Sequence, residues 1–92
     1  MAEQSDHERR IEAALSADVP DIYANGFVTT IGAADVLLVL ERHGRPEARM
    51  NLSYSLAKTL GESLSGAVQK FEEKTGANIP TTHDVDQAFG DD

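Results

Sequence analysis

An alternation of apolar and polar residues along the middle of the chain predicts three β-strands. We expect them at residues 22–31, 35–42 and 47–52. The second segment holds five consecutive apolar residues, Val36 to Leu40, a run typical of a strand covered on both faces. The third alternates, with Ala48, Met50 and Leu52 on one side, as in a strand with one face in water. Because the connections between the segments are short, the pattern predicts an antiparallel meander.

The first of these segments also carries apolar residues on both sides. They are Tyr23, Phe27 and Ile31 on one side and Ile22 and Val28 on the other. Gly26 inside a strand is typical of a bulge or of a close backbone approach. The dipeptide Asn25-Gly26 is also a hairpin signal, but the segment before it is too short to pair, so we favour one bulged strand.

Apolar residues at steps of three and four predict one long helix at residues 54–75. The stripe consists of Leu56, Leu60, Leu64, Ala67, Val68 and Phe71, and we expect it to face the sheet. Ser53 suits the position that caps the start of this helix, and Gly76 suits the position just beyond its end. One helix can cover only one face of a sheet, so the other apolar face needs a different partner.

A second stripe of small residues runs beside the first along the same predicted helix. Ala57, Gly61 and Ser65 are each four residues apart. Gly61 and Gly66 lie in the helix interior, where a glycine costs roughly 1 kcal/mol relative to alanine. Such a cost favours a close backbone approach, either between the helix and its own sheet or between the helix and a second helix across an interface.

The two ends of the chain differ from its middle, so we divide it into a leader (1–20), one domain (21–76) and a tail (77–92). Asp6 is a candidate cap for a short leader helix with Ile11, Ala14 and Leu15 on one face, which would need to dock to be stable. In the tail, residues 84–87 fit a capping box, so the alternatives are a solvated acidic tail, a short recognition peptide and a strap over the second face of the sheet. Together these features predict an α+β fold with flexible acidic ends.

Charge is concentrated in these ends. The chain has 92 residues and a net charge of −8, with six acidic and two basic residues in 1–22 giving −4. Residues 77–92 hold four acidic residues and no basic one, another −4, whereas residues 23–76 hold six of each. A neutral domain without a clustered basic face argues against direct binding to nucleic acid.

Several segments together resemble a small bacterial family of unknown function. They are the run Tyr23-Ala-Asn25, the apolar strand that ends in Glu41-Arg42, residues 48–53, and the helix that ends in Phe71-Glu-Glu-Lys-Thr-Gly76. The resemblance covers residues 22–76 and implies a meander closed by one helix that ends in an aromatic-Glu-Glu-x-x-Gly pattern. Tyr54 departs from the proline expected after the capping serine. The resemblance implies no established activity.

No group of residues predicts catalysis, a cofactor or a metal site. His7, His43 and His83 fall in the leader, a turn and the tail, without a metal-ligand spacing. The serines lack a neighbouring base in the sequence, and adjacent Glu72 and Glu73 are splayed about 100° apart on a helix. The chain has no cysteine, so thiol chemistry and disulfides are excluded. We therefore expect a protein that is not an enzyme.

The remaining hypothesis is a protein–protein interaction module that associates with itself. Interface candidates are Tyr23, Phe27, Ile31, Leu37, Val39, Ala57, Gly61 and Ser65. We expect a homodimer or higher homo-oligomer, paired sheet on sheet or edge on edge about a two-fold axis. It would act as an adaptor or chaperone-like protein that offers its open sheet face or a free edge to another polypeptide. The alternative is an acidic regulator or inhibitor, of phage or mobile-element type, that acts on a nucleic-acid enzyme. An acidic start and the lack of a long apolar segment favour a cytoplasmic protein without a membrane contact.

Overall fold

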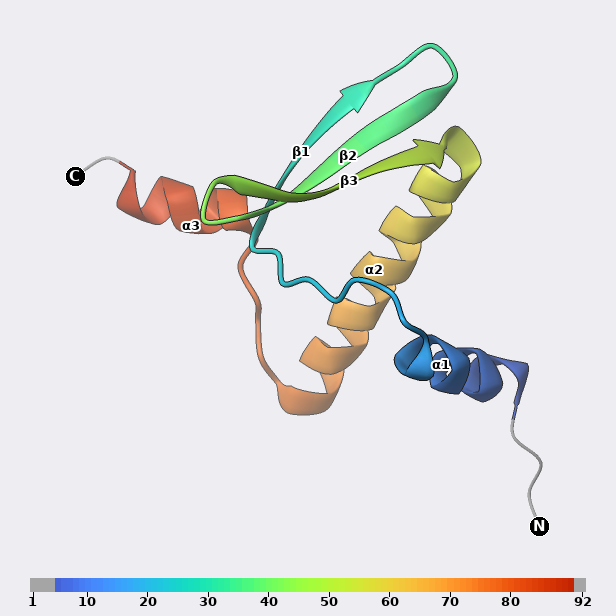
Figure 1. The fold of residues 1–92 in the computed structure, drawn as a ribbon. Helices are drawn as coiled ribbons and strands as arrows, with labels where there is room; N and C mark the ends of the chain where they lie inside the picture. The colour runs from blue at the N-terminus through green and yellow to red at the C-terminus, as the bar shows by residue number, and fades with distance from the viewer. Residues whose placement is uncertain (1–4, 91–92) are drawn as a thin grey trace.

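The computed structural model describes residues 5–90; the outermost parts of the predicted acidic leader and tail, residues 1–4 and 91–92, lie outside them. The elements in chain order are α1 (Asp6–Ser16), β1 (Gly26–Ile31), β2 (Asp35–Arg42), β3 (Arg45–Ser53), α2 (Tyr54–Thr75) and α3 (Thr82–Phe89) (Figure 1). The strands form one antiparallel sheet in the order β1-β2-β3. The predicted α+β fold with a β-meander and a following helix is confirmed.

The predicted bounds of two strands were wrong. β1 begins at Gly26 rather than at residue 22, and β3 spans 45–53 rather than 47–52. The backbone N–H of Asn25 donates to the Glu41 carbonyl, and Glu41 is also the register partner of Gly26. The consecutive residues Asn25 and Gly26 therefore lie opposite the single residue Glu41, as in the expected β-bulge. The chain before Asn25 is not part of the sheet. Tyr23 and Ile22 consequently lie in the connection to α1.

A tight turn at His43-Gly44 joins β2 to β3. His43 has φ 52° and Gly44 has φ 81°, so both central residues are left-handed, as in the turn that matches the twist of a hairpin. Between β1 and β2, the Gly32 N–H donates to the Asp35 carbonyl over 2.8 Å and closes the first turn.

The long helix α2 has the predicted bounds and both predicted caps. The Ser53 hydroxyl accepts from the Leu56 N–H, and Gly76 has φ 75° at the other end. The Tyr54 hydroxyl donates to the Gly32 carbonyl, which ties the first turn of α2 to the β1–β2 connection. Tyr54 therefore has a structural role at the position where the family resemblance implies proline.

The expectation that the apolar stripe of α2 faces the sheet was wrong for most of its length. Of the stripe residues only Leu60 is half-buried, whereas Leu56, Leu64, Val68 and Phe71 are exposed. Among the apolar residues of α2 only Ala57 and Leu60 are half-buried, and both lie near its start. The helix therefore leaves the sheet after its first turns and projects beyond it (Figure 1).

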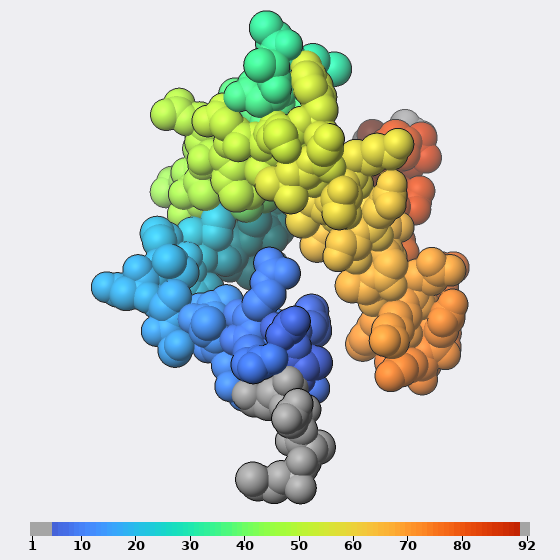
Figure 2. All heavy atoms as spheres, turned by 90° about the vertical axis from the view of Figure 1, so that its right-hand side faces the viewer, coloured from blue at the N-terminus to red at the C-terminus, as the bar shows by residue number. Residues whose placement is uncertain are grey.

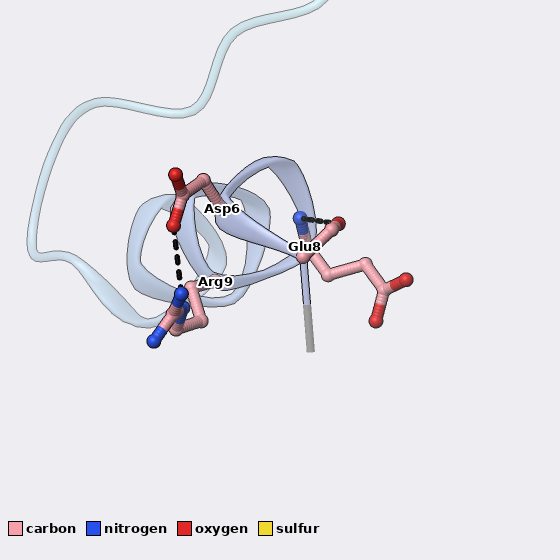
Figure 3. Close-up of polar contacts among 4 residues, drawn as sticks. Asp6, Glu8 and Arg9 are labelled. Carbon is pink, nitrogen blue, oxygen red and sulfur yellow. Dashed lines mark hydrogen bonds and ion pairs between the residues drawn. The ribbon is translucent and has the colours of Figure 1, made fainter. Parts of the chain in front are cut away.

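Both ends of the described chain contain a helix whose N-cap differs from the predicted one. Ser5, not Asp6, caps α1, because its hydroxyl accepts from the Glu8 N–H, while Asp6 forms an ion pair with Arg9 at 2.7 Å (Figure 3). In the tail, the capping box is formed by Thr81 and Asp84 rather than by residues 84 and 87. Glu72 holds the chain between α2 and α3, because its carboxylate accepts from the Ile79 N–H at 2.7 Å.

Candidate interaction surface

None of the described residues is buried, so the chain has no closed core of its own. It exposes 8249 Å², whereas a folded monomer of its 9.9 kDa exposes roughly 5,200 Å². Its radius of gyration is 16.6 Å, compared with about 12 Å for a compact domain of this length. Exposed large apolar side chains lie on three regions of the molecule.

The first region is the face of the sheet on which α2 starts. The strand register places nine residues on this face: Phe27, Thr29, Ile31, Val36, Leu38, Leu40, Ala48, Met50 and Leu52. The β2 and β3 members are only half-buried, and Phe27 and Ile31 on β1 are 60% and 80% exposed. An apolar hollow of about 430 Å³ opens here, lined among others by Phe27, Leu38, Leu40 and Leu64. Because α2 crosses near β3, the β1 side of this face stays uncovered.

The second region is the part of α2 that projects beyond the sheet. Leu64, Val68 and Phe71 are exposed along this part of α2, and Phe71 is 53% exposed. On a helical wheel these residues lie within about 60° of one another, so they form one continuous strip. Within residues 5–90, no atom of the chain's other segments lies within 4 Å of a Cβ built on Gly61 or Gly66. The close approach predicted at these glycines is therefore not to the chain's own sheet.

The third region is the leader, which in the structure extends to Asn25 because β1 begins only at Gly26. Its described part, residues 5–25, does not close over the rest of the chain. Every residue from Ser5 to Asn25 is exposed, and Leu15 on α1 is 82% exposed. Figure 2 shows that the leader and the end of α2 extend from the sheet as two separate projections with open space between them. The described part of the leader therefore does not cover the bare apolar surface.

The opposite face of the sheet is more polar. Leu37 and Val39 lie on it beside Val28 of β1, and their β3 partners in the register are Asn51 and Arg49. Leu37 and Val39 are both half-buried by their neighbours on the sheet. This face can remain in water at lower cost than the first, so Leu37 and Val39 are weaker interface candidates than Phe27 and Ile31.

The predicted interface residues are thus divided among several places. Phe27 and Ile31 lie on the open helix-side face, Tyr23 lies exposed in the leader, and Leu37 and Val39 lie on the far face. Ala57, in the first turn of α2, is half-buried, while Gly61 and Ser65 are exposed further along the helix. Sequence reasoning missed the exposed strip of Leu64, Val68 and Phe71, because an apolar helix stripe was assigned to the chain's own sheet.

Polar side chains do not converge on a reaction centre in the part of the chain that the structure describes. Residues 5–90 contain no group of three His, Asp or Glu side chains able to hold a metal ion. His43 contacts Asn25, and its role there is structural. None of the described helices is long and apolar enough to cross a membrane.

Comparison with protein-family models, curated proteins and solved structures found no match for this chain. The resemblance of residues 22–76 to a small bacterial family therefore stays a prediction.

Proposed function

We propose that the protein is an obligate homo-oligomer that acts as a protein–protein interaction module of the adaptor or chaperone-like type, and that it is not an enzyme. The observation that carries this proposal is the lack of any buried residue between Ser5 and Gly90, together with an excess surface of roughly 3,000 Å² per chain. Permanent protein assemblies bury areas of this size. A single copy would leave its apolar side chains in water and could not offset the entropy of folding.

A second copy of the chain is the partner that the charge distribution favours. Residues 23–76 are neutral overall, so two such domains can approach without net repulsion. The net negative charge lies in the two ends, and every described residue of α1 and α3 is exposed, so these charges can remain in solvent. A basic or acidic partner would gain little binding free energy from contact with the apolar strip on α2. The identical apolar strip of a second copy is complementary to it.

Self-association is tested by unfolding the protein in denaturant at several protein concentrations. For an obligate oligomer the midpoint rises with concentration, because association stabilises the folded state by mass action. A midpoint that is unchanged over a hundredfold range of concentration would contradict the proposal. The adaptor role is tested next, by titrating the assembled protein with a fluorescent, permanently unfolded polypeptide and measuring anisotropy. Absence of saturable binding at micromolar concentrations would contradict that role while leaving the oligomer in place.

A second candidate function is an acidic regulator of a nucleic-acid enzyme, and the helix α3 favours it. This helix carries Asp84 and Asp86 together with Phe89, which is 72% exposed, so it presents acid and an aromatic ring on one short element. Removing residues 80–92 separates the two functions. An adaptor that binds through the sheet face keeps its polypeptide partner, whereas an inhibitor loses its enzyme.

A further inference from the structure

The two edges of the sheet are unequal. β3, at one edge, contains Pro46, which has no N–H, and the charged residues Arg45, Glu47 and Arg49. Proline and charges are the features by which natural sheets prevent edge-to-edge pairing. β1, at the other edge, reads Gly-Phe-Val-Thr-Thr-Ile and has neither a proline nor a charge. Only β1 is therefore free to accept another strand.

The hydrogen bonds of β1 show which of its backbone groups are available. The Gly32 N–H donates to Asp35 on the β2 side, and alternate residues of a strand point their backbone groups in opposite directions. The backbone groups of Phe27, Thr29 and Ile31 consequently point away from β2. Each of these residues offers one N–H and one carbonyl along the outer edge.

From this pattern we propose that β1 pairs with β1 of a second copy, antiparallel about a two-fold axis at Thr29, and forms a continuous six-stranded sheet. This inference rests on the proposed self-association and specifies its geometry. The two-fold axis runs perpendicular to the sheet, so the helix-side faces of both copies lie on the same side. In this register Thr29 faces Thr29 of the other copy, and Phe27 faces Ile31, so the outward backbone groups all meet as hydrogen-bonded pairs.

The side chains fit the same register. Phe27 of each copy lies opposite Ile31 of the other on the apolar face, an aromatic and β-branched pair of the kind that stabilises antiparallel sheets. Thr29 opposite Thr29 gives a further favourable pair. A shift by one residue would place helix-side residues opposite those of the far face, so it is disfavoured.

The surroundings of β1 leave space for the incoming strand. A hollow of 410 Å³ lies between Phe27 and the start of α3 and is lined in part by Val85. In the paired sheet, the Ile31 side chain of the second copy would lie opposite Phe27 and beside this hollow. Each chain has one unprotected edge, so a pair of chains uses the unprotected edge of each copy. The assembly therefore ends at two copies and does not propagate into a fibre.

The register is tested with single cysteines, since the chain has none of its own. Thr29→Cys places two thiols in facing positions, where Cα atoms about 5.5 Å apart lie within disulfide range. We expect most of this variant to form a covalent dimer under mild oxidation. The matched control is Asn51→Cys on β3, which would lie five strand spacings, roughly 24 Å, from its copy and should remain reduced.

Amide hydrogen exchange provides the second measurement and needs no substitution. We expect slow exchange at the outward amides of Phe27, Thr29 and Ile31, at rates within tenfold of the amides that bond to β2. Fast exchange at these three amides, or no cross-link at Thr29 in a protein that sediments as a dimer, would overturn the edge pairing while leaving the self-association in place. A monomeric protein would contradict both.

Discussion

Asn25 holds His43 through two contacts, although the two residues are eighteen positions apart. The Asn25 Oδ1 accepts from the His43 backbone N–H over 2.8 Å, and Asn25 Nδ2 lies 3.1 Å from His43 Nδ1. His43 has a left-handed backbone, which a residue with a Cβ adopts at a cost. The asparagine therefore fixes the strained β2–β3 turn to the point where the leader enters the sheet.

Replacing Asn25 with alanine should destabilise the protein, because the His43 N–H loses its acceptor. We expect a loss of about 1 kcal/mol in the free energy of unfolding, the usual value of one such hydrogen bond. Asn51→Ala is the control, since Asn51 is an exposed asparagine of β3 without a side-chain hydrogen bond in the described structure. Denaturant titration of both variants gives the comparison, and equal stabilities would contradict the role given to Asn25.

Replacing Tyr54 with phenylalanine removes the hydroxyl that donates to the Gly32 carbonyl and leaves the ring unchanged. We expect a loss of about 0.5–1.5 kcal/mol, measured as a shift of the unfolding midpoint. Tyr23→Phe removes a hydroxyl from an exposed tyrosine of the leader and should have little effect. If both changes have the same effect, the link between α2 and the first turn does not contribute to stability.

The helix glycines provide a matched pair that detects a partner. In the single chain a Cβ has open space at both Gly61 and Gly66. Replacing either glycine with alanine should therefore raise the free energy of unfolding by about 0.5–1 kcal/mol through helix propensity alone. Gly66 lies on the polar side of α2, and we expect the full gain there. Gly61 lies beside the apolar strip, which a partner covers, so we expect a smaller gain or a loss. Equal gains in thermal denaturation would show that nothing approaches Gly61.

Phe71 tests whether the exposed strip on α2 is covered in the assembly. A substitution of a truly solvent-exposed residue changes stability by less than about 0.5 kcal/mol. We expect Phe71→Ser to weaken association at least tenfold, about 1.4 kcal/mol. Gln69→Ser, on the opposite side of the same helix, should leave association unchanged. The dissociation constants follow from sedimentation velocity over a dilution series, and an unaltered constant for Phe71→Ser would place the interface elsewhere.

The local elements were predictable from the sequence because their signals are local. The Ser53 cap, the Gly76 terminator and the alternation in 48–52 each act within a few residues. The start of β1 was not predictable, because the side chain of Asn25 is engaged by a turn eighteen residues away. The direction of α2 was missed for a related reason. A helical apolar stripe indicates that something covers it, but it does not distinguish the chain's own sheet from another molecule.

The most direct test of the account is the molar mass in solution, measured by sedimentation equilibrium at micromolar concentration. A chain of 9.9 kDa without a buried residue in its described part should be found as a dimer of about 20 kDa, twice the chain mass. A stable, cooperatively folded species of 9.9 kDa at the same concentration would contradict it.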